Sequence, residues 1–136
     1  MKKKFPSKYI KKGAFKLHSG EISDTFYDVN HLLTSWDELY STIIHFIDST
    51  MEYYDTYVGI ATGGAIIASN FIPYAMIKDG EVKGEVKGDY CLIDDVVTTE
   101  SSIREAIHII GYKPKKIYVV KDRRKVKVLE IISIYE

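Results

Sequence analysis

Apolar residues recur along the chain in two patterns, a long helical one near the N-terminus and short strand-like runs after residue 55. Between residues 35 and 54 the apolar positions have helical spacing, so we expect one helix there. Ser35 and Glu38 fit a capping box at its start. The apolar positions of this helix are Trp36, Leu39, Tyr40, Ile43, Ile44, Ile47 and Met51.

The second half of the chain alternates strand-like and helix-like segments. A glycine turn leads into a short helix at 62–71, and an amphipathic helix at 101–111 ends at Gly111. The run at 81–88 is bounded by glycines and predicts a small hairpin or a mobile loop. This alternation predicts an α/β fold with a mostly parallel sheet flanked by helices. Strands are expected at 56–61, 73–78, 90–94, 116–120 and 127–135.

The first 55 residues do not follow this alternation. We expect residues 1–55 to form an N-terminal hood, made of a small flap and the helix, beside a core at 56–136. A chain of 136 residues has the typical length of one domain, so hood and core are expected to make one compact unit.

Composition narrows the classes of function. Lysine plus arginine number 19 and aspartate plus glutamate number 19, which argues against a protein that mainly coats nucleic acid. Cys91 is the one cysteine, which excludes an intrachain disulfide and a cysteine-based metal site. We find neither a signal peptide nor an apolar run long enough to span a membrane. We therefore expect a cytoplasmic protein that binds neither nucleic acid nor membrane.

The stretch "CLIDDVVTTESS" at 91–102 carries the strongest chemical signal. Asp94 and Asp95 stand where a buried strand should end, and ligands of open α/β sheets bind at that edge. The helix that follows offers free N–H groups and a dipole that favour an anion. A phosphorylated sugar would satisfy both, with its hydroxyls or a hydrated magnesium ion on the acids. Hydroxyl donors come from Thr98, Thr99, Ser101 and Ser102.

A plainer interpretation is that Asp95 and Thr98 only cap the helix. We favour a binding site, because a cap needs one such residue rather than a pair of acids followed by several hydroxyls.

This stretch resembles the phosphoribosyl-pyrophosphate (PRPP) signature of the type I phosphoribosyltransferases. The resemblance implies their fold, with Asp94 and Asp95 near the ribose and its magnesium. Glu100 stands where the family usually has glycine, so its carboxylate either faces the phosphate or is turned away by the loop. The PRPP-binding turn implied by the resemblance consists of Val96, Val97, Thr98, Thr99, Glu100, Ser101 and Ser102.

Other segments resemble one branch of that family, the orotate phosphoribosyltransferases. "GAFKLHSGEISDTFYDVN" at 13–30 is similar to the N-terminal motif of the branch, which implies orotate contacts from Ser19, Phe26 and Tyr27. His18 stands where the branch has a lysine that contacts PRPP. Histidine is only partly charged near neutral pH, so we expect a weaker or pH-dependent contact.

Two further segments complete the resemblance. "GIATGGAIIA" at 59–68 is similar to the pyrophosphate-binding loop, which implies that Thr62, Gly63 and Gly64 present N–H groups to the diphosphate. "VVKDRRK" at 119–125 is similar to the strand end that carries the arginine for the orotate carboxylate, and Arg123 is the better match.

The family's long mobile loop is shortened in this chain. Lys78 matches the first lysine of that loop, and the resemblance makes it catalytic together with Asp94 and Asp95. Lys83 and Lys87 are candidate substitutes for the remaining lysines. A shorter loop excludes less water and offers less fixed charge to the leaving group, so slow turnover is expected.

The sequence leaves several functions open. The resemblance favours transfer of phosphoribosyl from PRPP to N1 of orotate, giving orotidine 5′-monophosphate and pyrophosphate, with magnesium as cofactor and a homodimer as assembly. A second hypothesis is a non-catalytic module that binds PRPP, a nucleotide or a protein. A third is the same chemistry on another base, such as a purine.

Overall fold

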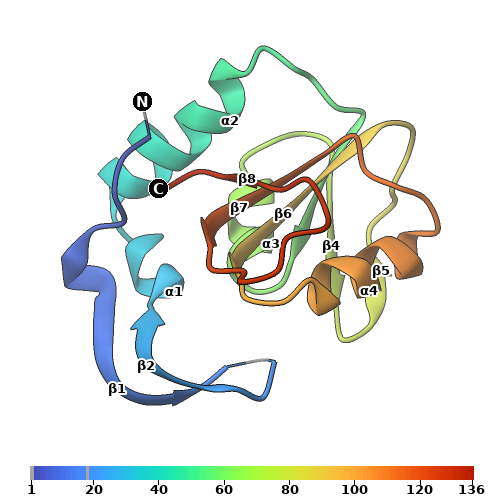
Figure 1. Ribbon diagram of the computed structural model, residues 1–136. Helices are drawn as coiled ribbons and strands as arrows, with labels where there is room; N and C mark the ends of the chain where they lie inside the picture. The colour runs from blue at the N-terminus through green and yellow to red at the C-terminus, as the bar shows by residue number, and fades with distance from the viewer. Residues whose placement is uncertain (1, 18) are drawn as a thin grey trace.

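The computed structural model describes residues 2–17 and 19–136. A central sheet has helices on both faces, and a separate N-terminal hairpin stands out from this body (Figure 1). The predicted α/β fold with a mostly parallel sheet is therefore confirmed. Within the described residues, no helix is long and apolar enough to cross a membrane.

The central sheet has six strands in the order β5-β4-β3-β6-β7-β8. All neighbouring pairs are parallel except β4 and β5, which form an antiparallel hairpin at one edge. A hairpin within 81–88 does not form: only 81–83 is a strand, and it pairs with the preceding strand β4. The strands are β3 (Thr56–Ile60), β4 (Tyr74–Lys78), β5 (Glu81–Lys83), β6 (Tyr90–Val97), β7 (Lys116–Asp122) and β8 (Ile132–Ser133).

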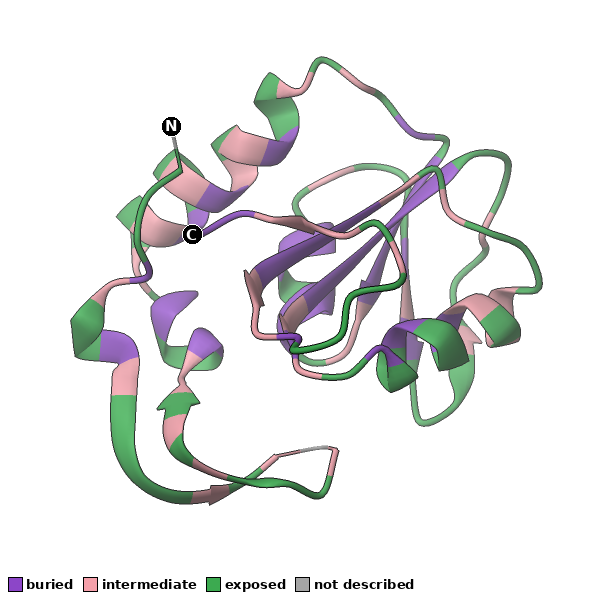
Figure 2. Ribbon diagram, viewed as in Figure 1, coloured by how far each residue is buried: buried purple, intermediate pink, exposed green. Residues whose placement is uncertain are grey.

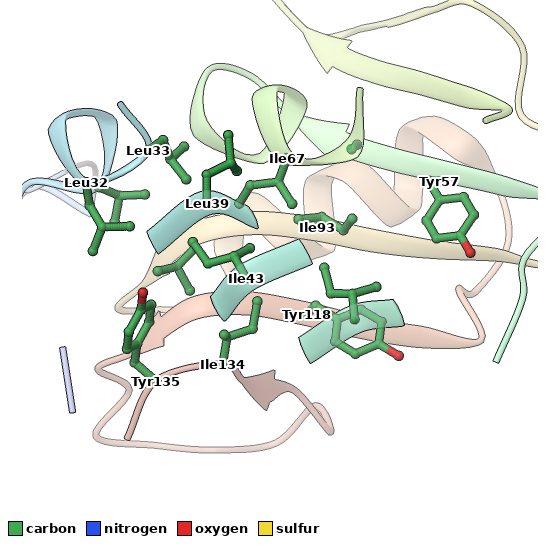
Figure 3. Close-up of a cluster of buried hydrophobic side chains, with 14 of the residues drawn as sticks. Leu32, Leu33, Leu39, Ile43, Tyr57, Ile67, Ile93, Tyr118, Ile134 and Tyr135 are labelled. Atoms are coloured by element: carbon green, nitrogen blue, oxygen red, sulfur yellow. The ribbon is translucent and has the colours of Figure 1, made fainter. Parts of the chain in front are cut away.

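The central strands are buried from both sides, as their unbroken apolar runs predict. In β6, Cys91 and Ile93 belong to the cluster on one face, whereas Leu92 belongs to the cluster on the other. The first face is covered by α3 and the N-terminal helices (Figure 3). The second face is covered by α4, whose Ile103 is fully buried. The helices are α1 (Val29–Leu32), η2 (Asp37–Ile44), α2 (His45–Ser49), α3 (Gly63–Ala68) and α4 (Ser101–Ile110).

The N-terminal segment has two parts with different surroundings. A short turn, η1 (Ser7–Tyr9), leads into the antiparallel pair β1 (Ile10–Lys16) and β2 (Ile22–Tyr27), which is largely exposed (Figure 2). In contrast, η2 and α2 bury their apolar sides on the sheet, so residues of the hood and of the core share one cluster. The division at residue 55 stays a prediction.

The helix predicted at 35–54 is shorter than expected. Helical structure runs from Asp37 to Ser49, first with wide π-type turns in η2 and then as α2. It ends because Met51 takes a left-handed conformation with φ of 61°. The capping box is also wrong: no side chain caps the start of η2, and the Glu38 carboxylate accepts a hydrogen bond from the Tyr135 hydroxyl instead.

The last predicted strand, 127–135, is mostly irregular. Its strand part is Ile132–Ser133, which pairs with β7, and the N–H groups of Ile134 and Tyr135 also donate to the β7 backbone. The N–H groups of Val128 and Leu129 donate to the Glu100 carboxylate, at 2.7 and 2.9 Å, so they are not available to a neighbouring strand. This part of the backbone is held by side chains, a long-range arrangement that strand periodicity does not reveal.

The turn after β3 passes very close to the end of β6. A Cβ atom on Gly64 would lie 2.2 Å from the carbonyl oxygen of Ile93, and one on Gly59 would lie 2.2 Å from the carbonyl oxygen of Gly64. Only glycine allows such an approach. This contact brings the 62–64 turn beside Asp94 and Asp95.

Gly64→Ala is expected to lower the free energy of unfolding by more than about 3 kcal/mol, because a backbone atom must move to admit the methyl group. Gly63→Ala is the matched control and should cost less, since its Cβ would meet the Asp95 side chain at 2.9 Å rather than backbone. Urea denaturation of both variants measures the difference. A Gly64→Ala midpoint equal to that of the wild type would contradict this account of the turn.

Candidate active site

A cavity of about 220 Å³ opens where β3 and β6 end. This edge is where parallel sheets of this type place their ligands. The structure brings together at this cavity most of the residues predicted to bind a phosphorylated sugar. They are Thr62, Asp94, Asp95, Val96, Val97, Thr98, Thr99, Ser101 and Ser102, and Ser19, which was predicted to contact orotate, lines the same cavity.

The two acids are held by the backbone that follows them. The N–H of Asp95 donates to Oδ1 of Asp94 at 2.8 Å, and the N–H of Val96 donates to Oδ1 of Asp95 at 2.7 Å. Gly63 sits against the Asp95 side chain. One oxygen of each carboxylate is thus used to fix its orientation, and the second is not engaged by these bonds.

Asp94 differs from Asp95 in its surroundings. Only 7% of Asp94 is exposed, whereas Asp95 is half-buried. Burial raises the pKa of Asp94 well above its ordinary value, and the negative charge of Asp95 beside it adds to this shift. A ligand that brings hydroxyl donors or positive charge to this carboxylate relieves both effects.

The turn from Thr98 to Ser102 carries hydroxyl groups into the cavity. The Thr99 and Ser101 hydroxyls are 2.9 Å apart and hydrogen-bonded, and α4 begins at Ser101. Across the cavity lies Ser19, whose buried Oγ has no hydrogen-bond partner among the described residues. A buried hydroxyl without a partner is costly, so a polar ligand in this cavity would stabilise it.

Glu100 settles the choice left open by the sequence, because its carboxylate is turned away from this cavity. It bonds Arg124 Nη1 at 2.6 Å and Arg104 Nη2 at 2.7 Å, besides the N–H groups of Val128 and Leu129. Arg124 is itself buried and pairs with Asp122 at 2.8 Å. The phosphate turn is therefore free of opposing charge from Glu100.

This network sets the ionisation of Glu100. Burial alone would raise the pKa of its carboxyl group. The N–H groups of Val128 and Leu129 and the side chains of Arg104 and Arg124 outweigh burial and lower the pKa to about 2. Glu100 is thus charged throughout the neutral range.

A larger cavity, of about 980 Å³, lies between the start of β2 and the segment 123–128. Thr98 and Thr99 line both cavities, so the two adjoin at the phosphate turn. Arg123 lines the larger one. Its guanidinium donates to Ser23 Oγ at 3.2 Å and to the carbonyl oxygen of Thr25 at 3.3 Å.

The predicted aromatic pair is split by the alternation of β2. The Tyr27 ring lies under the Arg123 guanidinium, with 4.8 Å from Cζ to the ring centroid. Phe26 faces the other side of the strand and stacks on Phe15 at 5.4 Å. The structure therefore brings Tyr27 to Arg123 and does not bring Phe26 there.

Two other predicted residues lie apart from the cavities or outside the description. Lys78 ends β4, is exposed, and pairs in register with Glu81. It lines neither cavity. His18 lies outside the described residues.

Sequence reasoning missed the role of Arg124, which is the residue next to the chosen Arg123. The pattern Asp122-x-Arg124 gives a weak local signal for an ion pair, but the partner Glu100 is 24 positions away. Asn30 also lines the smaller cavity, and nothing in its surroundings in the sequence marked it.

Asp94→Asn is expected to stabilise the fold at pH 7. Because the pKa of Asp94 is raised in the folded state, its contribution to stability falls as pH rises above about 4, the pKa of an unfolded aspartate. Asparagine removes that loss, so the melting temperature should rise by about 3 °C or more at pH 7 and by less at pH 4. Calorimetry at both pH values measures this, with exposed Asp89→Asn as the control. An unchanged or lower melting temperature at pH 7 argues against a buried, charge-opposed Asp94.

Glu100→Gln is expected to destabilise the protein at pH 7 by about 3 kcal/mol, because it leaves the buried Arg124 without its charged partner. The pKa of Glu100 is lowered, so its contribution is present above about pH 5 and is lost as pH falls toward 2. The stabilities of wild type and variant should converge over that range. Urea titrations at several pH values test this, with exposed Glu105→Gln on the same helix as the control. A stability difference between wild type and variant that does not change with pH would contradict the role assigned to the Glu100 charge.

Comparison with known proteins places this arrangement in a family. No family model matches the chain. The orotate phosphoribosyltransferase of Sulfurisphaera tokodaii is 32% identical over 132 residues, covering 83% of this chain and 67% of that protein. That of Methanosphaera stadtmanae is 29% identical over 136 residues, covering 85% of this chain and 76% of that protein.

A solved structure gives the same result. The crystal structure of orotate phosphoribosyltransferase from Aeropyrum pernix superposes with a TM-score of 0.69 at 26% identity, covering 85% of this chain and 76% of that one. The resemblance carried by the acids, the hydroxyl turn and the N-terminal motif is confirmed: the chain belongs to the orotate phosphoribosyltransferase family.

Proposed function

We propose that the protein transfers the phosphoribosyl group of PRPP to N1 of orotate, giving orotidine 5′-monophosphate and pyrophosphate. The observation that carries this proposal is that the residues suited to a sugar and to its phosphate line one cavity. Two adjacent carboxylates and a hydroxyl-rich turn at a helix start line it together, and it adjoins a second cavity that holds an arginine.

The smaller cavity suits the sugar and its phosphate. The turn from Thr98 to Ser102, with the N–H groups at the start of α4, binds the 5′-phosphate. Asp94 and Asp95 accept hydrogen bonds from the ribose hydroxyls. The diphosphate then lies toward the 62–64 turn, which the close contact of Gly64 with Ile93 holds beside the acids.

The larger cavity suits the base. A guanidinium binds a carboxylate through paired hydrogen bonds, and Arg123 is positioned for this by Ser23 and by the ring of Tyr27. The orotate carboxylate is thereby directed toward Arg123. The orotate ring then lies next to the sugar, because Thr98 and Thr99 border both cavities.

In the reaction, the bond from C1 of the ribose to the diphosphate oxygen breaks as the bond from N1 to C1 forms. The electron pair of the broken bond goes with the pyrophosphate, which also takes up the N1 proton. Positive charge develops on the ribose ring in the transition state. Asp94 and Asp95 favour that charge electrostatically, and no protein nucleophile is needed.

Magnesium is the cofactor that fits these residues. Among the described residues no cluster of three or more histidine, cysteine or acidic side chains could hold a metal alone. A pair of carboxylates beside a diphosphate suits magnesium, which keeps several waters and binds phosphate oxygens. When bound, it would neutralise charge on the leaving pyrophosphate.

The assembly and location remain proposals. A homodimer fits the family and the short loop, because a partner chain could supply charge that this chain lacks; sedimentation velocity tests it. A cytoplasmic location stays a prediction.

One observation favours the alternative of a binding module without turnover. The lysines of the 79–88 segment are engaged locally, with Lys83 2.7 Å from Glu81 and Lys87 3.6 Å from Glu85. Neither lines the cavities. Less fixed positive charge is then offered to pyrophosphate.

Asp95→Asn is expected to lower turnover at least 100-fold, because a carboxylate beside the developing charge is lost. The measurement is orotate consumption by the purified protein with PRPP and magnesium, next to the double variant Asp94→Asn, Asp95→Asn. Circular dichroism of each variant checks the fold, and Asp89→Asn is the exposed control.

The outcomes separate the two functions. Turnover that is lost in the folded Asp95→Asn protein supports the enzyme. Equal turnover in the wild type and in the folded Asp95→Asn variant would rule out the role given to Asp95. Binding of PRPP by a wild type that turns over no base would favour the binding module.

A further inference from the structure

A third cavity, of about 530 Å³, lies on the side of α4 and has no role in the proposed reaction. Its walls come from α4, from the segment that enters β7, and from the chain between Leu129 and β8. Its volume is within the range of small-molecule sites, roughly 300–1,000 Å³. Within the described residues, neither acid of the proposed active site lines it.

The walls of this cavity are apolar and its rim is positive. Ile107, Ile117, Leu129 and Ile132 supply aliphatic surface. Basic side chains on this rim come from Arg104, Lys113, Lys115 and Lys116, and His108 also lines the cavity. Glu130 is the one acidic side chain among the lining residues.

This combination selects a ligand class. An apolar body would bury the isoleucine surface, and an attached anionic group would be attracted by the rim. A cavity of this size encloses a small molecule rather than a protein segment. We propose that it is a binding site for a small aromatic or aliphatic anion, such as a carboxylate, sulfonate or phosphate ester.

The cavity is connected to the phosphate turn through Glu100, and Arg104 lines both this cavity and the larger active-site cavity. Arg104 lines the cavity and donates to Glu100 Oε1 at 2.7 Å. Leu129 lines it as well, and its N–H donates to Glu100 Oε2 at 2.9 Å. Glu100 directly follows Thr98 and Thr99, which line both active-site cavities.

This connection gives the site a regulatory role, which rests on the proposed function of the phosphate turn. An anion in the cavity competes with Glu100 for Arg104, whose side chain is 52% exposed and able to move. Glu100 is then less neutralised beside the turn that binds the 5′-phosphate. Occupancy should therefore weaken PRPP binding, and PRPP should weaken anion binding by the same factor.

The first experiment measures binding to the cavity alone. The probe is 8-anilinonaphthalene-1-sulfonate, an aromatic anion whose fluorescence rises in apolar sites. We expect one probe per chain, and at least tenfold weaker binding in the double variant Lys113→Glu, Lys115→Glu. The matched control is Lys2→Glu, Lys4→Glu, which makes the same charge change on the exposed N-terminus. Equal affinity in both double variants, with both folded, would overturn the site.

The second experiment measures the linkage. With saturating probe, the dissociation constant for PRPP should rise about fivefold or more in the wild type. In Arg104→Gln it should not change, because no side chain then connects probe and Glu100. An unchanged constant in the wild type would overturn the linkage and leave the site standing. If PRPP does not bind at all, the proposed function fails, and the first experiment still decides the site.

Discussion

The Glu100 carboxylate is the contact on which the arrangement of the site depends. It joins the end of the phosphate turn to α4 through Arg104 and to the C-terminal segment through Arg124, Val128 and Leu129. That segment has no regular structure of its own before β8, yet it forms one wall of the larger cavity. Because the carboxylate is saturated by these donors, it holds the wall in place and stays away from the phosphate turn.

The two acids are likewise explained by their immediate surroundings. Asp94 is buried beside a second carboxylate, an arrangement that opposes ionisation and costs stability. Such a cost persists where it serves binding. Here it directs two acceptors into a cavity that also contains the Ser19 hydroxyl, which has no hydrogen-bond partner within the described part of the chain. Each group on its own is unfavourable, but a sugar phosphate would satisfy all of them at once.

Much of this could be predicted from the sequence. The apolar run ending in Asp94 and Asp95, and the hydroxyls after it, identified the smaller cavity because strand, turn and helix start are local patterns. The direction of Glu100 could not be predicted, since its partner Arg124 is distant in the sequence. For the same reason the prediction of a strand at 127–135 was mostly wrong. The backbone of this segment is bound by a side chain from another element, which periodicity cannot show.

The strand geometry of β2 explains why Phe26 and Tyr27 lie in different surroundings. A motif suggests a pair, but a strand sends neighbouring side chains to opposite faces. Only Tyr27 reaches the core side, where it meets Arg123, the residue that follows β7. Most of the hood hairpin is exposed, and Arg123 also holds it by hydrogen bonds to Ser23 and to Thr25. A ligand carboxylate that engages Arg123 would therefore compete with the hydrogen bonds that Arg123 donates to Ser23 and Thr25.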